Sequence, residues 1–362
     1  MDALDSATKI EERLCVKATM AGIPLGGTFE LSPACNMSCK MCYARLGMEE
    51  ITAQGGLKTG DQWLKIAEEM QKEGTMFLLL TGGEPLLYPD FKHVYEGVRK
   101  MGMIVTINTN GTLITEEWAK YFAQDKPRRI NITLYGVNEK GYENLCGYKE
   151  GFDRTINGIQ LLKEKNVDIK LNVSLTPDNV KDLDEFYRIA EQLEVPIEVD
   201  SYMFPFHREK GEYEQKNRLS PEVCAETYLK ILKKEKPLGY EKYQQLCQMC
   251  GEGKKFPNHD MVTCRAGRSS FWINWKGEMS PCFAVESKKI DVSKIGFRKS
   301  WERIREYVNN VKLSEKCICC EKQELCISCA GRAFSETGNT AGTPTYICKY
   351  MDWIVDEQVK EQ

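Results

Sequence analysis

An alternation of strand-like and helix-like segments is the feature that most constrains the fold of this chain. Apolar runs of strand length recur from residue 28 to residue 204, and stretches of helical period separate them. The predicted strands are 28–34, 77–81, 103–109, 129–135, 168–175 and 196–204. The predicted helices lie near 59–73, 90–101, 115–124, 152–165 and 179–194. This order predicts an α/β fold with a parallel sheet and crossover helices.

The length of the alternating region limits the architecture. It spans about 175 residues, which is short of the roughly 250 residues of an eight-unit barrel. A partial (β/α)6 TIM-like barrel fits this length, and so does an open sheet. In either fold, the residues that carry chemistry gather at the C-terminal edge of the strands. Turn residues follow several predicted strands at that edge, namely Ser32–Ala34, Gly82–Pro85 and Asn110–Gly111.

Composition and charge exclude several classes of partner. The net charge of −3 gives no reason to expect nucleic acid or an anionic membrane as the main partner. The N-terminus lacks the basic start and apolar run of a signal peptide. The longest apolar runs, such as Phe77–Leu80, are too short to span a bilayer. We therefore expect a cytoplasmic protein.

Sixteen cysteines are unusual for a chain of this kind. Cytoplasmic thiols are kept reduced, so a disulfide framework is a poor explanation. Metal or iron–sulfur ligation is a better one, because the cysteines are grouped. Three lie within 35–42, and ten lie between Cys247 and Cys348.

The first group is Cys35, Cys39 and Cys42, separated by three and then two residues. Three thiolates can hold three irons of a cubane cluster and leave the fourth iron open to a ligand. A structural zinc site needs four ligands, and no fourth Cys or His lies nearby. The group follows the first predicted strand, so we expect it at the mouth of the barrel.

In this spacing the sequence resembles the radical S-adenosylmethionine (SAM) enzymes, although Met41 stands where an aromatic residue is usual, with Tyr43 just after the triplet. The resemblance implies a [4Fe–4S] cluster on Cys35, Cys39 and Cys42, whose open iron binds the amino and carboxylate groups of SAM. One electron then cleaves the sulfonium and yields a 5′-deoxyadenosyl radical, which abstracts hydrogen from a substrate.

A second motif supports the resemblance. Gly82-Gly83-Glu84-Pro85 matches the family's glycine-rich motif after the second strand and implies SAM-binding residues there. Glycines allow close approach of the backbone to a ligand, and a carboxylate with backbone carbonyls suits an ammonium group. Thr109, Asn110 and Thr133 lie where the family places polar contacts to the ribose or carboxylate of SAM.

The C-terminal cysteines resemble the SPASM extension of radical enzymes, which holds two auxiliary [4Fe–4S] clusters and brings the expected total to three. One departure is that two residues, not three, separate Cys326 from Cys329. A double zinc ribbon is the alternative. The ligands that the resemblance implies are Cys264, Cys282 and Cys329 for auxiliary cluster I, and Cys317, Cys320, Cys326 and Cys348 for auxiliary cluster II. The fourth ligand of cluster I is left open between Cys247, Cys250 and an open iron, and Cys319 is a spare thiol or an alternate ligand.

The predicted organisation has four parts. Residues 1–27 form a short helix and a linker, 28–205 the barrel, 206–262 a charged bridge with a helix at 221–235, and 263–362 the SPASM extension. A β-hairpin is predicted at 271–279, with its turn near Lys276-Gly277. The N-terminal part is short for a leader-binding domain, so leader recognition is expected elsewhere.

The function implied by the resemblance is an oxidation that modifies a ribosomally made peptide, with thioether, ether or carbon–carbon crosslinks as products. The peptide is expected to carry a leader, and an external electron donor of flavodoxin or ferredoxin type is expected. Cys146 and Asp200 are the candidate catalytic residues. The alternatives are protein oxidation of the sulfatase-maturase kind, radical modification of a small metabolite, and a zinc-binding protein without activity. Phe283-Ala284 follow Cys282 where the sulfatase-maturing relative has an acid, which favours the peptide maturase.

Overall fold

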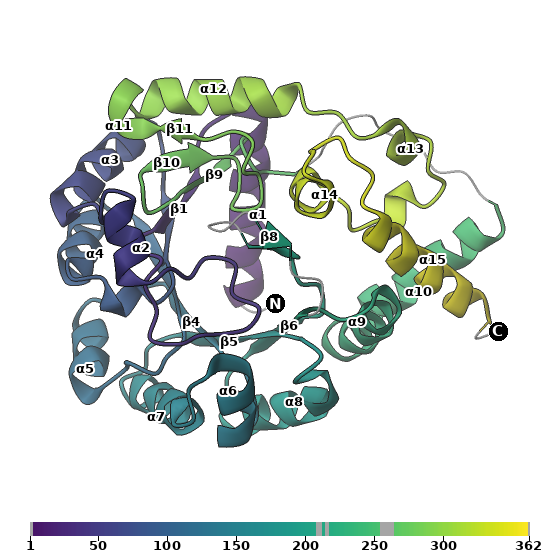
Figure 1. Ribbon diagram of the computed structural model, residues 1–362, viewed down its shortest axis with the longest axis horizontal. Helices are drawn as coiled ribbons and strands as arrows, with labels where there is room; N and C mark the ends of the chain where they lie inside the picture. The colour runs from purple at the N-terminus through teal and green to yellow at the C-terminus, as the bar shows by residue number, and fades with distance from the viewer. Residues whose placement is uncertain (1–2, 208–211, 214–216, 254–263, 361–362) are drawn as a thin grey trace.

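The computed structural model describes residues 3–207, 212–213, 217–253 and 264–360. Six parallel strands form the barrel region and follow one another in sequence order from β1 to β6. Their bounds are β1 Gly26–Glu30, β2 Phe77–Thr81, β3 Ile104–Thr109, β4 Arg129–Thr133, β5 Ile169–Ser174 and β6 Ile197–Asp200. Helices lie on the outside of this curved sheet (Figure 1). The predicted partial barrel is confirmed.

The crossover helices also agree with the sequence pattern. The predicted helices appear as α3 Gly60–Lys72, α4 Phe91–Lys100, α5 Glu116–Gln124, α7 Gly151–Glu164, α8 Leu183–Gln192 and α9 Pro221–Glu235. Side-chain caps define two of the starts, because Thr59 accepts from the Gln62 N–H and Thr115 from the Trp118 N–H. Among the described residues before 254, three α-helices were not predicted: α2 Met48–Ala53, α6 Glu139–Cys146 and α10 Pro237–Gly251.

The first strand differs from its predicted bounds. It runs over Gly26–Glu30 and not over 28–34. Leu31 still donates its N–H to Thr81 O at 2.9 Å. Pairing then stops, because Pro33 has no N–H to offer and the chain turns away to carry the cysteines.

The N-terminal helix is longer than the predicted short helix. It is α1, Ala3–Ala21, and it lies at the N-terminal ends of the strands. Thr19 Oγ1 lies 2.8 Å from Ser269 Oγ, and Glu11 pairs with Arg128 just before β4. The helix therefore covers the end of the barrel that faces away from the cysteines.

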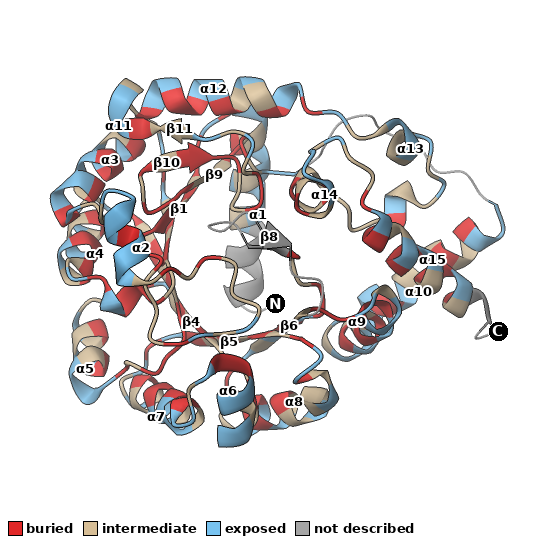
Figure 2. Cartoon of the chain, in the orientation of Figure 1, coloured by how far each residue is buried: buried red, intermediate tan, exposed pale blue. Residues whose placement is uncertain are grey.

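Strand residues alternate between two environments (Figure 2). On β5, Ile169, Leu171 and Val173 are buried against the surrounding helices, while Lys170 and Asn172 on the other face are half-buried. The same alternation on β4 puts Asn131 on the inner face. The inner surface of the barrel is therefore largely polar, and the apolar core lies between strands and helices.

The sheet continues beyond the six strands into the C-terminal part of the chain. β9 Ser270–Ile273 pairs in parallel with β1 and forms a hairpin with β10 Glu278–Ser280, which in turn pairs with β11 Ile290–Asp291. The predicted hairpin is thus confirmed, and Gly277 adopts φ +79° at its turn. Its position in the barrel sheet was not predicted. The division into four parts stays a prediction, and one sheet crosses its boundary at 262–263.

The remaining elements of the extension pack on the barrel and on one another. They are α11 Val292–Ile295, α12 Phe297–Asn309, α13 Glu315–Ile318, α14 Ala330–Thr337 and α15 Thr345–Lys360, which lies beside α9 and α10. A buried ion pair, Arg218 with Glu336 at 2.6 Å, joins the residues before α9 to α14. Tyr202, just after β6, donates to Glu336 at 2.8 Å. Within the described residues, no helix is long and apolar enough to cross a membrane.

The shared sheet predicts that the hairpin stabilises the barrel. Phe271 is buried and packs on Phe297 and Trp301, so Phe271→Ala should cost about 3–5 kcal/mol of the free energy of unfolding. Leu238→Ala is the control, because Leu238 is 80% exposed and its loss should change stability by less than about 0.5 kcal/mol. Thermal unfolding followed by circular dichroism measures both. A barrel transition that Phe271→Ala leaves unchanged would contradict the shared core.

Candidate functional site

The loop after β1, residues 32–46, carries Cys35, Cys39 and Cys42 at the C-terminal edge of the sheet; we call it the cysteine loop. Backbone hydrogen bonds hold this loop in place from two sides. Ser32 O accepts from the Gly83 N–H at 2.7 Å and Ala34 O from the Glu84 N–H at 2.8 Å. On the other side, the C-terminal carbonyls of α6 accept from Ser38 N and Lys40 N at 2.8 and 2.9 Å. The three thiols are therefore held in place by β2 and by α6.

The glycines of the Gly82–Pro85 motif have a role that the sequence did not indicate. A Cβ on Gly82 would lie 2.4 Å from Ser32 O, and a Cβ on Gly83 would lie 2.4 Å from Ala34 O. The close approach that requires glycine is therefore to the cysteine loop. An additional approach to SAM stays a prediction. Pro85 is buried and begins a short 3₁₀ helix, Pro85–Leu87.

Glu84 is buried, and its carboxylate has a full set of partners inside the protein. It accepts from Thr109 Oγ1 at 2.8 Å, from Asn110 N at 2.8 Å and from Leu86 N at 3.0 Å. Burial raises the pKa of this carboxyl to about 7, and these hydrogen bonds lower it in part. The carboxylate joins the ends of β2 and β3, and this geometry gives no support to the expected direct contact with the SAM ammonium group.

An amide network connects β3 to the cysteine loop. Asn110 Nδ2 donates to Asn36 Oδ1 at 2.9 Å and lies 3.8 Å from Cys35 Sγ. Asn36 in turn donates to Thr112 Oγ1 at 2.8 Å. Thr109 and Asn110 thus both lie at the site, but their hydrogen bonds go to the protein.

Thr133 ends β4 and is half-buried on the inner face of the barrel. Two buried oxygens nearby in the sheet, Asn131 Oδ1 and Asn172 Oδ1, have no hydrogen-bond partner in the part of the chain that the structure describes. Asn172 lies opposite Thr133 in the register of β4 and β5. Sequence reasoning missed both asparagines, although polar residues at alternate strand positions were the available signal. Unsatisfied inward amides indicate a place for a polar ligand.

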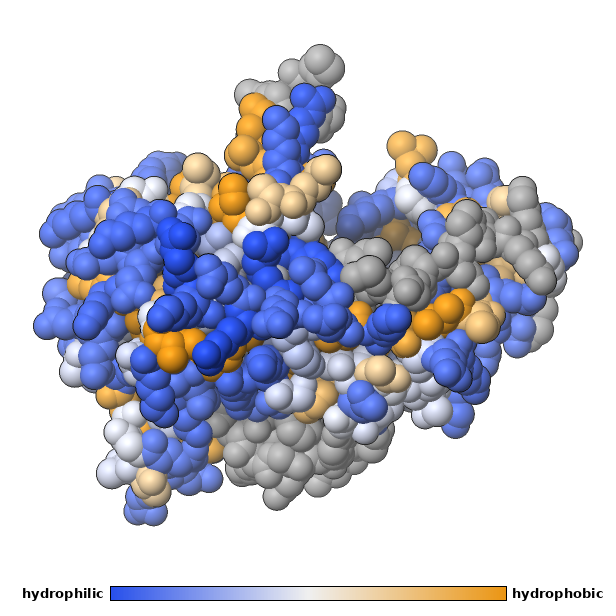
Figure 3. Space-filling view, turned by 90° about the horizontal axis from the view of Figure 1, so that it is seen from above, coloured by the Kyte–Doolittle hydropathy of each residue, from blue (hydrophilic) through white to orange (hydrophobic). Residues whose placement is uncertain are grey.

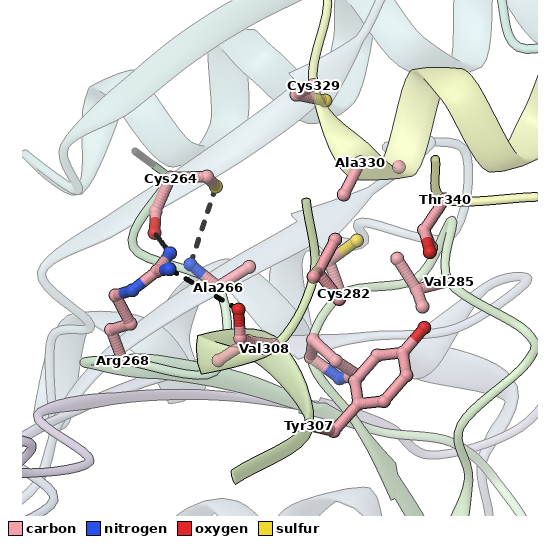
Figure 4. Close-up of a pocket in the computed structure, with 13 residues that line it drawn as sticks. Cys264, Ala266, Arg268, Cys282, Val285, Tyr307, Val308, Cys329, Ala330 and Thr340 are labelled. Atoms are coloured by element: carbon pink, nitrogen blue, oxygen red, sulfur yellow. Dashed lines mark hydrogen bonds between the residues drawn. The ribbon is translucent and has the colours of Figure 1, made fainter. Parts of the chain in front are cut away.

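Three of the C-terminal cysteines line one pocket. Cys264, Cys282 and Cys329 surround it together with Val285, Tyr307 and Thr340 (Figure 4). Burial raises the pKa of Cys282 to about 12. The cysteines come from the loop before β9, the loop after β10 and the N-cap of α14, so the fold brings together the set predicted for auxiliary cluster I.

A neighbouring pocket is lined by the set predicted for auxiliary cluster II. Its cysteines are Cys317, Cys320, Cys326 and Cys348, and Cys264 and Cys329 also reach it. Burial raises the pKa of Cys326 to about 11. Cys319 is exposed and does not line this pocket.

The fourth ligand of the first set stays open between Cys247, Cys250 and an open iron. Cys247 and Cys250 lie on α10, and neither lines the pocket of Cys264, Cys282 and Cys329. Cys250 instead donates to Glu321 O at 3.6 Å, beside the second set. The reason is that α10 packs against α9 and α15, which the sequence pattern did not show.

Hydrogen bonds to sulfur occur at five of the predicted ligands. Backbone N–H groups donate to the sulfur of Cys35, Cys42, Cys264, Cys326 and Cys329 at 3.3–3.4 Å. Cys224 and Cys250 instead donate to backbone carbonyls. A sulfur that accepts N–H bonds suits a thiolate or a cluster ligand. Among the described residues, no three Cys, His, Asp or Glu side chains are placed to hold a single metal ion.

Comparison with known proteins places this geometry in a family. The model of the radical SAM superfamily matches residues 29–190, which contain the cysteine loop and the Gly82–Pro85 motif. The chain carries a radical SAM domain. Proteins with this domain are enzymes that use a [4Fe–4S] cluster and SAM.

Individual relatives are distant but cover most of the chain. An AdoMet-dependent heme synthase of Methanosarcina barkeri is 24% identical over 348 residues, covering 88% of this chain and 95% of that protein. The PqqA peptide cyclase of Bradyrhizobium diazoefficiens is 23% identical over 339 residues, covering 89% and 85%. The crystal structure of Streptococcus suis SuiB bound to its precursor peptide SuiA has the same fold, with a TM-score of 0.69, 17% identity and coverage of 95% and 81%.

The two candidate catalytic residues of the radical SAM enzyme lie in different settings. Cys146, at the end of α6, is fully buried, and its backbone carbonyl accepts from Ser38 N in the cysteine loop at 2.8 Å. It supports the cysteine loop from behind, which does not favour hydrogen donation to a substrate. Asp200 ends β6 and reaches solvent, and Tyr202 N donates to it at 2.9 Å. Desolvation by the surrounding protein still raises the pKa of Asp200, so it stays the candidate for a base.

Four aromatic residues connect the cysteine loop to the extension of the radical SAM enzyme. The Phe283 ring lies 5.0 Å from Tyr43, 4.9 Å from Phe204 and 5.6 Å from Trp272, centre to centre. Tyr43 follows Cys42 and Phe283 follows Cys282, and all four rings are half-buried. This aromatic group therefore lies between two of the cysteine sets.

The close contact at Gly83 predicts a mutant effect. Gly83→Ala would place its Cβ against Ala34 O and displace the cysteine loop. Since small misplacements at a reaction centre are costly, we expect about a 100-fold loss in the rate of SAM cleavage. Gly26→Ala is the control, because its Cβ would lie 4.0 Å from the nearest atom. Formation of 5′-deoxyadenosine under dithionite measures both, and a Gly83→Ala rate equal to that of the control would refute this role.

Proposed function

We propose that this radical SAM enzyme oxidises a ribosomally made peptide and forms a crosslink in it, of the thioether, ether or carbon–carbon type. The observation that carries the proposal is the convergence of seven C-terminal cysteines on two adjoining pockets beside the barrel. A crosslink removes two electrons from the substrate, and hydrogen abstraction accounts for only one of them. Auxiliary clusters in these pockets give the second electron a path.

The cysteine loop fits the first cluster. Cys35, Cys39 and Cys42 would hold it, and the N–H groups of Met37 and Arg45 donate to two of these sulfurs. Bound there, a [4Fe–4S] cluster and SAM supply the 5′-deoxyadenosyl radical that abstracts hydrogen. Asn172 and Thr133 offer polar groups on the inner face for SAM. Glu84 acts indirectly, because it fixes the strand ends from which these contacts are made.

The C-terminal pockets fit the auxiliary clusters. Cys264, Cys282 and Cys329 would hold the nearer cluster, and Cys317, Cys320, Cys326 and Cys348 the farther one. N–H bonds to Cys264, Cys326 and Cys329 suit cluster ligands, since such bonds tune the charge on sulfur. A double zinc site on the same cysteines is the alternative, and the metal content distinguishes the two.

A peptide substrate is supported by two of the similar proteins and by the aromatic group. The names of the PqqA peptide cyclase and of the SuiB complex both refer to peptides. Tyr43, Phe204, Trp272 and Phe283 offer ring surfaces between the cysteine sets, which suit an apolar or aromatic side chain.

A small-molecule substrate is the second candidate. The similarity to an AdoMet-dependent heme synthase extends over 88% of the chain and favours it. The same aromatic rings could stack on a planar macrocycle. Oxidation of the sulfatase-maturase kind has less support, because Phe283, which cannot accept a proton, occupies the position after Cys282.

Cluster content tests the cofactor assignment. After anaerobic reconstitution we expect about twelve irons per chain, four for each of three cubanes. Replacing Cys35, Cys39 and Cys42 together by Ala should remove about four irons and abolish 5′-deoxyadenosine formation. Replacing Cys282 and Cys329 together by Ala should remove about as many irons and leave dithionite-driven SAM cleavage in place. Zinc in place of iron, or cleavage that survives loss of the first three cysteines, would disprove the assignment.

Mass spectrometry tests the substrate class. We expect that co-expression with a short Cys-rich or aromatic-rich peptide encoded beside the gene lowers the peptide mass by two hydrogen atoms for each crosslink. In a parallel reaction, the enzyme is given a tetrapyrrole precursor of heme, and heme formation is followed by its absorbance. Heme formation with an unmodified peptide would replace the peptide proposal by the small-molecule one.

A further inference from the structure

A groove rich in cations lies beside the pocket of Cys264, Cys282 and Cys329. It is lined by Lys288, Arg303 and Lys312. The groove and the cysteine pocket share three wall residues, Tyr307, Val311 and Thr340. Figure 4 shows Tyr307 and Thr340 at the edge of the cysteine pocket. The groove is therefore separated from these cysteines by a single layer of side chains.

The cations of the groove are available to a partner. They come from three segments, namely the loop before β11, α12 and the residues after α12. Arg303 and Lys312 are exposed, and Lys288 is half-buried with its Nζ 5.9 Å from the centre of the Tyr307 ring. None of the three forms an ion pair with a carboxylate among the described residues.

The local charge contrasts with that of the whole chain. The protein has a net charge of −3, whereas the described lining of the groove contains three cations and one carboxylate, Glu306. Figure 3, which looks onto α12 from above, shows mainly hydrophilic side chains there. A concave cationic surface on an acidic protein attracts and orients an acidic partner.

The proposed reaction requires an exit for one electron. The substrate first loses a hydrogen atom to the 5′-deoxyadenosyl radical, which becomes 5′-deoxyadenosine. The substrate radical then forms its new bond and releases one proton and one electron. The proton goes to a base or to water, and the electron must reach an oxidant, since no second substrate takes it up. An oxidised one-electron carrier protein is such an oxidant, and its reduced form can supply the electron that starts the next cycle.

We propose that the groove of Lys288, Arg303 and Lys312 docks a small acidic one-electron carrier protein, which exchanges electrons through Cys264, Cys282 and Cys329. The carrier is of the class that holds a flavin or an iron–sulfur centre near an acidic surface. This inference rests on the proposed function, because it needs a redox centre at these cysteines. Electron exchange is direct only over short distances, and this cationic groove shares three wall residues with the pocket of the cysteine set.

Charge reversal in the reconstituted full-length enzyme tests the docking site. The variant is Lys288→Glu/Arg303→Glu/Lys312→Glu, and the probe is an acidic flavodoxin reduced beforehand and mixed with the enzyme in a stopped-flow instrument. We expect the second-order rate of flavodoxin oxidation at low salt to fall at least about ten-fold. The dependence of this rate on salt should also weaken. SAM cleavage driven by dithionite should not change.

The matched control reverses three cations elsewhere. Lys100, Lys126 and Lys140 are exposed on the side of the barrel formed by α4 to α6, so their replacement by Glu changes the net charge equally. We expect less than about a two-fold effect from it. Equal losses in both triple variants, or an unchanged rate in the groove variant, would overturn the docking site.

A milder variant guards against misfolding. If the triple variant contains less iron than the wild type, the flavodoxin rate is measured instead with the double variant Arg303→Gln/Lys312→Gln. Both of these side chains are exposed, so their replacement should leave the fold intact. A fall in its flavodoxin rate supports the site, and no fall rejects it. Failure of the proposed function gives a different result. If these cysteines hold no cluster, the variant Cys282→Ala/Cys329→Ala will have the iron content and the flavodoxin rate of the wild type.

Discussion

One buried carboxylate holds the reactive edge of this protein together. Glu84 accepts hydrogen bonds from the end of β3 and from the start of the 3₁₀ helix after β2, and its own N–H donates to the cysteine loop. A buried carboxylate is costly unless donors surround it. Here the donors are backbone and side-chain groups at the end of β3 and in the 3₁₀ helix. The position of Cys35 therefore depends on contacts made from β2 and β3 as much as on the loop itself.

Much of the barrel and of the cysteine chemistry could be predicted from the sequence. Strand and helix periods are local signals, and β2 Phe77–Thr81 and α9 Pro221–Glu235 occur where the pattern predicted them. The cysteine sets could be predicted because the spacing of the cysteines in the sequence resembles that of known cluster-binding motifs. The structure brings Cys264, Cys282 and Cys329 together although many residues separate them.

Other features depend on contacts that no local pattern contains. The pairing of β9 with β1, the position of α10 and the partners of Glu84 are all results of long-range packing. The glycine motif shows the difference clearly. Its match to a family was evident, but the reason for Gly83 is the carbonyl of Ala34, which only the folded chain reveals.

The pairing of β1 with β9 has a consequence for synthesis of the protein. β1 is made first among the strands, but Glu30 and its hydrogen-bond partner Trp272 are 242 residues apart. Until the last third of the chain leaves the ribosome, one edge of β1 has no neighbour from the hairpin. The sheet is therefore completed late, and the same event brings Cys282 to the side of the cysteine loop through the contact of Phe283 with Tyr43. The sheet is completed and the two cysteine sites are brought together at the same stage of folding.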